Sequence, residues 1–411
     1  MKDKINFNNL NQLIFYSIPL ALILSNFLAN AAVIYLSIYG IYQIFLNRNF
    51  EVLKNNLVKI FILFCVFISI NALILDVFLL SIKSSFSFIR YLFFIIGVYY
   101  LYKKNYNLFL NFFIIYLFIL IFLFIDANYQ IINEGINVFG FNSYYIQSER
   151  ISSIFFEELI LGSYVQKFTI LTVCYLYCFY KKNLNYLTFA SLIISIEICF
   201  ISGERTALFS IILFFFTFII FFMDISKFKK FIFLTSSIII FLILIVQNPN
   251  VKNRIFTNTL ENISSSNYIY FSPGHKNHLD VALNLFKNKP ISGYGSNTFR
   301  IACHEVQNKL KIIGCSTHPH NLVAQFLAEK GIIGLIFLLF FYLYIISNLF
   351  KSLINFDQSI HKKKALILFS ILILFNPLFP SPNFYNSWVN NIIFIIFTYC
   401  FIIGYNKIKN V

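Results

Sequence analysis

The sequence predicts an all-α integral membrane protein, and three observations support this fold class. Of the 411 residues, 59% are hydrophobic and only 12% are charged, whereas soluble domains carry about 25% charged residues. Aromatic residues make up 20% of the chain, which suits helices that face lipid and the membrane interface. Long apolar stretches recur from one end of the chain to the other. This composition excludes a soluble globular enzyme, a collagen-like chain, a coiled coil and a disordered chain.

Twelve apolar stretches have roughly the length that a membrane-spanning helix needs, and we expect each to form one span. The first two are short and adjacent, so a tight hairpin is the alternative for them. Residues 1–411 as a whole are expected to form a single polytopic membrane domain. The expected spans are approximately residues 13–29, 31–46, 60–80, 85–102, 108–126, 163–180, 185–202, 206–223, 231–247, 331–350, 364–380 and 388–405.

Lysine and arginine are concentrated in alternate connections between the expected spans, and this alternation predicts the topology. With the N-terminus inside, the even-numbered connections and the two termini hold 18 of the 32 basic residues. We therefore expect both termini in the cytoplasm and the first apolar stretch to be a retained helix instead of a signal peptide. Because the net charge of +16 is explained by these topology-setting clusters, it does not indicate a nucleic-acid partner.

Two connections on the outer side are long, at about residues 127–162 and 248–330. Long loops of this kind usually carry function. The larger loop, between spans nine and ten, holds five of the six histidines. Apolar residues at helical spacing predict a short amphipathic helix over Asn277–Asn288 and a second one after Asn321. We expect these helices to lie on the outer membrane face, with the candidate active site in the 248–330 loop.

Two of the seven cysteines, Cys303 and Cys315, are twelve residues apart in the larger outer loop. A disulfide between them would stabilise the loop by about 3 kcal/mol, and the outer compartment permits its formation. Two free thiols are the alternative. No C-x-x-C pair occurs in the chain, which excludes a zinc ribbon and a thioredoxin-like motif.

Charged residues within the spans are candidates for function, because a charge at the centre of a membrane costs at least about 2.5 kcal/mol. Arg90 lies inside the fourth expected span and Glu197 inside the seventh. For these two, a structural ion pair or snorkelling toward the interface is the alternative.

Arginine is rare in this chain, with six arginines against 26 lysines, and four of the six are expected on the outer side. A guanidinium presents a planar fork that matches phosphate oxygens. Arg205, directly after the seventh span, together with Arg150, Arg254 and Arg300, therefore predicts a site for a lipid-linked phosphate or diphosphate. Loosely solvated charge is the alternative.

His318 and His320 flank Pro319 in the outer loop. Histidine titrates near neutral pH, so one of the pair is a candidate general base. A metal site together with His275 and His278 and a purely structural turn, rigidified by the proline, are the alternatives. Since no carboxylate or cysteine stands at ligand spacing beside the pair, we expect neither a metal nor another cofactor.

Several segments of the chain resemble the O-antigen ligase and polymerase family. They are Gly203–Ala207, which contains Arg205, the turn Phe286–Gly295, and Thr317–Gly334, which has the pattern H-N-x-x-x-Q-x-x-x-E-x-G-x-x-G. Residues 150–164 are similar to the first outer loop of polymerase-like members. The resemblance covers about residues 150–345. One departure is that many ligases carry an arginine just before the loop helix, where this chain has Pro273-Gly274-His275. This departure leaves open which residue completes the phosphate-binding set.

The resemblance implies a C-type fold and a metal-independent, inverting glycosyltransferase in the bacterial inner membrane, with its active site facing the periplasm. The implied donor is an oligosaccharide on undecaprenyl diphosphate, and the acceptor is a sugar hydroxyl of a growing glycan or of the lipid A-core. The segment Glu157–Gly162 favours a polymerase over a ligase. Membrane lipid and other polysaccharide-assembly proteins are implied as further partners.

Under this interpretation His320 and Arg205 are the expected catalytic residues. His320 would take the proton of the acceptor hydroxyl, and Arg205 would stabilise the departing diphosphate. Expected substrate-binding residues are Arg150, Arg90, Arg300, His275, His318, Asn321 and Glu158, with Tyr144, Tyr145, Tyr268 and Tyr270 as candidates for stacking on sugars.

The main alternative from another functional class is a twelve-helix transporter or flippase. Such proteins tend to show internal repeats and paired broken helices, and the sequence shows neither. A partner-binding component of an envelope complex is the third class considered.

Overall fold

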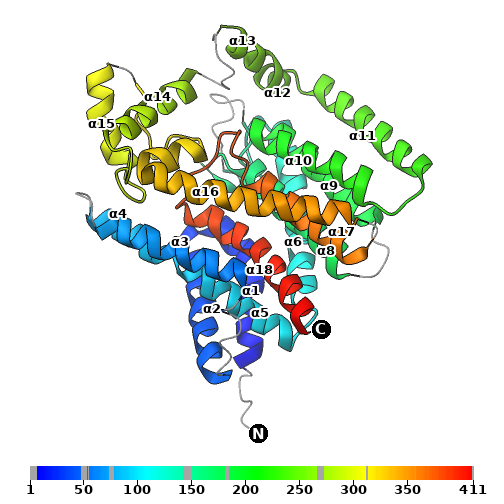
Figure 1. Cartoon of the computed structure of the whole chain (residues 1–411). Coiled ribbons are helices and arrows are strands. Elements are labelled where there is room, and N and C mark those ends of the chain that lie inside the picture. The colour runs from blue at the N-terminus through cyan, green and yellow to red at the C-terminus, as the bar shows by residue number, and fades with distance from the viewer. Residues whose placement is uncertain are drawn as a thin grey trace.

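The structure, a computed structural model, confirms the all-α fold class: in the described part of the chain the regular elements are helices, without a β-strand (Figure 1). The described residues are 7–47, 53, 55–73, 78–141, 150–156, 158–180, 185–265, 273–311, 313–356 and 358–409.

The described part of residues 7–132 contributes six apolar helices, of which α2 and α5 pack backbone against backbone. A Cβ atom on Gly40 would lie 2.1 Å from the carbonyl oxygen of Phe93, and one on Gly97 would lie 2.2 Å from that of Leu36. Small residues permit this close approach, which is a common way for helices to associate in lipid. The six helices are α1 (Phe7–Leu24), α2 (Asn26–Asn47), α3 (Asn56–Leu73), α4 (Phe78–Phe88), α5 (Arg90–Lys104) and α6 (Leu108–Ile132).

The middle of the chain supplies both a central and a peripheral helix. α8 (Leu161–Phe179) is buried over nearly its whole length and packs against α6, α9 (Asn185–Ile201) and α10 (Arg205–Thr217). α10 continues into the π-helical turn η3 (Phe218–Phe222). In contrast, α11 (Lys227–Gln247) lies at the edge of the bundle and is largely exposed (Figure 1). In a bilayer this exposed surface faces lipid.

Short helices of the larger outer loop gather beside the outer end of the bundle. They comprise α12 (Pro249–Lys252), η4 (Asn253–Thr257), α13 (Asn258–Ser265), α14 (Pro273–Asn288) and α15 (Phe299–Leu310). α14 and α15 share a small core with the start of α16 (Leu322–Ile354), which includes Val281, Leu285, Phe299 and Ala328. The chain then ends with α17 (Ser359–Leu374) and α18 (Ser387–Lys409).

Within the described residues, each of the twelve expected apolar stretches lies largely on helix, although several bounds differ. In this part of the chain, six helices are long and apolar enough to cross a membrane by length and composition, and four further apolar helices are shorter. The number of crossings and the location of the termini remain predictions. α14 confirms the expected amphipathic helix, and the helix expected after Asn321 is the beginning of α16. The expected span 364–380 is too long, because the helix ends at Leu374, just before Pro377, a residue that cannot continue it.

α16 is broken at Gly331, where the turn 290–295 docks against it. Gly331 has φ 62° and ψ −159°, a conformation that is essentially restricted to glycine. The free backbone groups at the break are used by the turn: the N–H groups of Tyr294 and Gly295 donate to the carbonyls of Ala328 and Glu329, and the N–H of Ile332 donates to the carbonyl of Pro290. This docking joins the outer helices to the membrane bundle.

We expect Gly331→Ala to destabilise the protein more than Gly140→Ala. Both glycines have positive φ, 62° and 79°, which costs a residue with a Cβ atom about 1–2 kcal/mol. A Cβ at position 140 meets nothing within 4 Å, whereas one at position 331 would lie 2.3 Å from the carbonyl oxygen of Ile291. Thermal unfolding of the purified variants in detergent measures the difference. Equal decreases in Tm would contradict the docking of the turn on α16.

Candidate functional site

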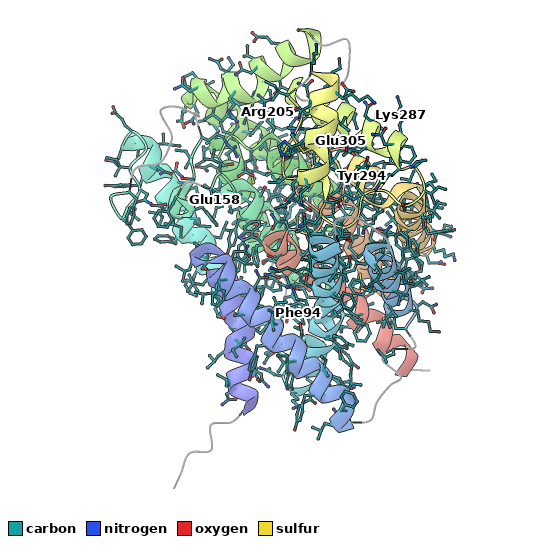
Figure 2. The ribbon with its side chains drawn as sticks, turned by 90° about the vertical axis from the view of Figure 1, so that its left-hand side faces the viewer. Phe94, Glu158, Arg205, Lys287, Tyr294 and Glu305 are labelled. Atoms are coloured by element: carbon teal, nitrogen blue, oxygen red, sulfur yellow. A yellow bond between two sulfur atoms is a disulfide. The ribbon has the colours of Figure 1, made fainter. Side chains whose placement is uncertain are left out.

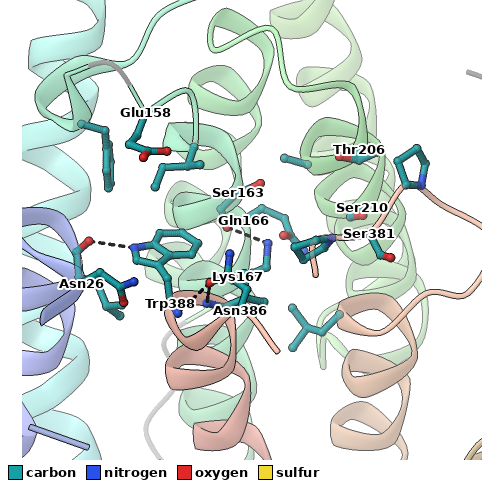
Figure 3. A pocket seen from close by; sticks show the side chains of 18 of the residues that line it. Asn26, Glu158, Ser163, Gln166, Lys167, Thr206, Ser210, Ser381, Asn386 and Trp388 are labelled. Carbon is teal, nitrogen blue, oxygen red and sulfur yellow. Dashed lines mark hydrogen bonds between the residues drawn. The ribbon is translucent and has the colours of Figure 1, made fainter. Parts of the chain in front are cut away.

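A cavity of about 820 Å³ lies between the ends of α1, α8, α10, α17 and α18 (Figure 3). These are the helix ends that the predicted topology places on the outer side of the membrane. Leucine and isoleucine side chains of α1 and α17 line part of the cavity, and polar groups line the rest. The polar side chains are those of Ser25, Asn26, Glu158, Ser163, Gln166, Lys167, Thr206, Ser210, His318, His320, Asn376, Ser381 and Asn386.

The loop between α17 and α18 enters the bundle and holds the histidine turn in place. The N–H of Ser381 donates to the carbonyl of His320 at 2.9 Å. The Nε2 of His318 lies 3.0 Å from the carbonyl oxygen of Ser381, so this nitrogen carries the hydrogen. The Nδ1 of His318 then accepts from the hydroxyl of Thr317. Both nitrogens of His318 are therefore used to fix the loop, which gives this residue a positioning role.

His320 has a backbone conformation that is unusual for a residue with a side chain, with φ 52°. Such strain persists only where the surroundings impose it, and it is frequent at functional sites. Its Nε2 lies 3.3 Å from the hydroxyl of Ser316, and the residue lines the cavity. The next residue, Asn321, is not among the residues that line the cavity. It caps α16 by accepting from the N–H of Ala324.

Three other histidines surround His320, with ring centroids at 5.6 Å for His275, 5.1 Å for His278 and 4.1 Å for His318. Burial, together with these neighbouring rings, lowers the pKa of His320 to about 3. Burial is also the main cause that lowers the pKa of His318 to about 4. The pKa of His275 is lowered by burial and by the charges of His278 and Arg205. The four histidines form one cluster, in which the lowered pKa values of His275, His318 and His320 favour their neutral forms at pH 7.

The expectation of a base whose pKa lies near neutral does not hold for His320. At pH 7 the His320 imidazole is already deprotonated, so it can accept a proton, but as a weak base. The causes are burial and the nearby imidazoles, which sequence spacing alone does not show.

The histidine cluster does not have the geometry of a metal centre. Among the described residues, the three ligand groups whose donor atoms lie within 4.8 Å of one another are Cys303, His304 and Cys315. The two cysteine sulfurs of that group are bonded to each other in the structure, with Cα atoms 5.3 Å apart. The disulfide ties α15 to the segment that leads into the histidine turn.

Three of the four outer arginines meet at the turn between α9 and α10. The Nη2 of Arg205 donates to the carbonyl of Arg254 at 2.8 Å, and the Nε of Arg254 donates to the carbonyl of Gly203. Arg150 donates to the carbonyls of Leu159 and Ser202. Figure 2 shows Arg205 toward the outer helices and Phe94 deeper in the bundle. The predicted arginine cluster therefore forms, with much of its hydrogen bonding directed at backbone carbonyls.

Glu204 is buried beside these arginines. Its carboxylate accepts from the N–H groups of Gly162 and Ser163 and from the Ser163 hydroxyl, and it lies 3.8 Å from Arg150. Burial raises the pKa of Glu204 despite the attraction of Arg150, and burial lowers the pKa of Arg150 despite the attraction of Glu204. This carboxylate fixes the turn against the start of α8.

The remaining expected site residues are dispersed. Arg300 is exposed and bonds the side chain of Asn297. Arg90 bonds Asn30 and Tyr91 away from the cavity lining, and Glu197 contacts Asn128, so the suggested Arg90–Glu197 ion pair does not form. Glu158 does line the cavity. Glu157 and the four tyrosines proposed to stack on sugars lie outside the described residues.

Sequence reasoning missed two parts of the site. Lys167, within α8, lines the cavity, as do residues of the α17–α18 loop, among them Ser381 and Asn386. A lysine inside an apolar stretch is itself a signal and could have identified Lys167. The run Asn376–Asn386, rich in proline and asparagine, could have been recognised as too polar to end a span.

The long apolar helices define a multi-pass membrane protein with a cavity at the helix ends that is lined by both polar and apolar side chains. Residues 190–339 match the family model described as O-antigen ligase. This match confirms, for that part of the chain, the resemblance found in the sequence. The match runs from α9 to α16 and so includes the arginine turn, the outer helices and the histidine turn. No curated protein matched the chain.

Lowering the pH from 7.5 to 5 should destabilise the protein through the histidine cluster. The folded pKa values of His318 and His320 are about 4 and about 3, below the usual value of about 6.5 for an unfolded chain. Between these limits the unfolded chain binds more protons, so stability is full above about pH 6.5 and falls as the pH decreases. Thermal unfolding in detergent at the two pH values measures this loss.

The double variant His318→Gln, His320→Gln should lose less Tm between pH 7.5 and 5 than the wild type does. His361→Gln, which changes a histidine outside the cluster, is the control and should follow the wild type. An unchanged pH dependence in the double variant would show that the cluster does not hold its histidines neutral.

Proposed function

We propose that this protein is a glycosyltransferase of surface polysaccharide assembly that transfers an undecaprenyl-diphosphate-linked glycan to a sugar hydroxyl. The observation that supports this proposal most directly is the position of His320. It lies on strained backbone at the wall of a cavity formed by the outer ends of apolar helices. A cavity at that level can admit a ligand that has both a lipid chain and a polar head. The family match to O-antigen ligase supports the same class of substrate.

In the proposed reaction, an acceptor hydroxyl oxygen bonds to the anomeric carbon of the donor, and the bond from that carbon to the phosphate oxygen breaks. The diphosphate leaves with the bonding electrons, and the hydroxyl proton passes to a nitrogen of the neutral His320 ring. Displacement from the face opposite the diphosphate inverts the anomeric centre. Arg205 precedes Thr206, which lines the cavity. From this position beside the lining, Arg205 and its neighbouring arginines stabilise the charge of the leaving diphosphate electrostatically, so the chemistry needs no metal.

We assign the protein to the bacterial inner membrane with the cavity facing the periplasm, in agreement with the distribution of lysine and arginine. Transfer onto a growing glycan, the polymerase reaction, is favoured over transfer to lipid A-core. Glu158, from the first outer loop, lines the cavity and offers a carboxylate that can accept hydrogen bonds from sugar hydroxyls. Other polysaccharide-assembly proteins would deliver the donor to this face of the membrane.

Deletion of the gene should change the distribution of glycan between its carrier and lipid A. Loss of a polymerase leaves single repeats on lipid A, whereas loss of a ligase leaves long glycan on undecaprenyl diphosphate. Separation of lipid A species and carrier-linked species by gel electrophoresis and mass spectrometry distinguishes the two outcomes. We expect the first. An unchanged glycan in both pools would contradict the proposed function, and donor accumulation on the inner face would indicate a flippase.

His320→Ala should abolish transfer while the protein remains folded. Loss of a general base reduces the rate by about 10²–10⁴-fold, and the ring makes only one long hydrogen bond, to Ser316, so the Tm should change little. Complementation of the deletion strain measures activity by glycan chain length, and thermal unfolding measures stability. A decrease in activity of only a few-fold would indicate that His320 has a structural role in its turn and is not the general base.

His318→Ala is the matched control from the same turn. It removes the hydrogen bonds that hold Ser381 and Thr317, so we expect a lower Tm together with a partial loss of activity. Complete loss of activity at an unchanged Tm would assign the base to His318 in place of His320.

A further inference from the structure

Lys167 is a buried cation in the wall of the cavity. It lies two turns into α8, is 8% exposed, and lines the cavity together with its neighbour Gln166 (Figure 3). The other ionisable groups of the lining are Glu158, His318 and His320. Because the two histidines are neutral at pH 7, Lys167 carries the positive charge of this lining.

The protein provides little compensation for this charge. The Nζ atom of Lys167 makes one hydrogen bond, of 3.4 Å, to the carbonyl of Ser163. The carboxylate of Glu204 attracts Lys167, but it also accepts three hydrogen bonds from Gly162 and Ser163 and lies 3.8 Å from Arg150. Glu204 and Lys167 do not form an ion pair within 4 Å. A charge at this depth is costly unless something offsets it.

A second buried lysine, Lys330, has several polar groups around its ammonium group that offset the cost of burying the charge. Lys330 is 1% exposed, and its Nζ donates to the side chains of Asn71 and Ser296 and lies over the ring of Tyr385. Lys330 is thus held by polar groups from three segments of the chain. Lys167 lacks a comparable set and faces open volume instead.

The cavity around Lys167 suits a molecule with an anionic head and an apolar chain. Ser210 and Thr206 on α10 add hydroxyl groups to the lining, and Trp388 with Leu22 and Ile23 adds an apolar wall. The guanidinium groups of Arg150 and Arg205 hydrogen bond to backbone carbonyls and are not part of the lining.

We propose that Lys167 is the subsite that binds the phosphate groups of a polyprenyl diphosphate inside the cavity. This proposal rests on the proposed function and adds to it a binding residue within the membrane. A buried ammonium group attracts a phosphate oxygen strongly, because the low-dielectric surroundings screen the two charges only weakly. Lys167 therefore gives the cavity its preference for a diphosphate over an uncharged polyprenol.

The test measures that preference with the full-length protein in lipid nanodiscs. Trp388 is the single tryptophan of the chain and lines the same cavity, so its fluorescence reports binding directly. The probes are farnesyl diphosphate and farnesol. Wild type should bind the diphosphate more tightly, and Lys167→Met should weaken diphosphate binding by about tenfold or more, as expected for the loss of one charged contact. Farnesol binding should not change.

Two further variants complete the comparison. Lys167→Arg keeps the charge and should keep the preference for the diphosphate. Lys104→Met, the same substitution at the other end of the bundle, where Lys104 donates to the hydroxyl of Tyr39, should behave as wild type. If Lys167→Met does not fold, the double variant Lys167→Met, Glu204→Gln removes both buried charges and answers the same question.

The outcomes separate the two proposals. Equal affinity of the wild type for farnesyl diphosphate and farnesol would contradict the proposed donor class. A wild type that prefers the diphosphate, with an unchanged preference in Lys167→Met or in the double variant, would overturn the role of Lys167 alone. A decrease in Tm without a change in affinity would indicate that Lys167 stabilises the fold by neutralising the charge of Glu204 and does not bind the diphosphate.

Discussion

The buried carboxylate of Glu329 is the interaction on which the outer half of the structure depends. Apolar surroundings do not satisfy free backbone groups, and α16 is interrupted at Gly331 where the outer helices must join the bundle. Glu329, 1% exposed, accepts from the N–H groups of Asn297 and Phe299 and so holds the start of α15 against the break. The disulfide between Cys303 on α15 and Cys315 then anchors the segment before the histidine turn to α15.

Gln325, one helical turn before Glu329, anchors the loop between α17 and α18 in the same way. Its side-chain NH2 donates to the side chain of Asn383, and its side-chain oxygen accepts from the N–H of Phe384. The residues of the H-N-x-x-x-Q-x-x-x-E-x-G pattern therefore divide by role: Asn321, Gln325, Glu329 and Gly331 position segments, and the proposed chemistry is left to His320. Most residues of this motif support the candidate site structurally.

Local patterns in the sequence were sufficient for the helices and for the candidates near the arginine and histidine turns, because apolar periodicity and residue type are local properties. They were insufficient where the site is assembled from distant segments. The contact of His318 with Ser381 spans 63 residues. The low pKa of His320 arises from burial and from neighbouring histidines, two of which, His278 and His275, lie on the distant helix α14. Arg90 and Arg300 were plausible by charge alone, but their side chains bond neighbouring amides away from the cavity. No local pattern encodes which face of the bundle a side chain will reach.

The neutral ring of His320 and the positive charge of Lys167 have a consequence for the proposed reaction. Burial and the neighbouring imidazoles keep the pKa of His320 low, so its ring is a weak base. A diphosphate bound in the same cavity places negative charge near this ring, and a nearby negative charge favours the protonated imidazole and raises its pKa. The donor itself would therefore strengthen the base that activates the acceptor. Lys167 limits this effect by neutralising part of the added charge, so the balance between the two residues sets how basic His320 becomes when the donor is bound.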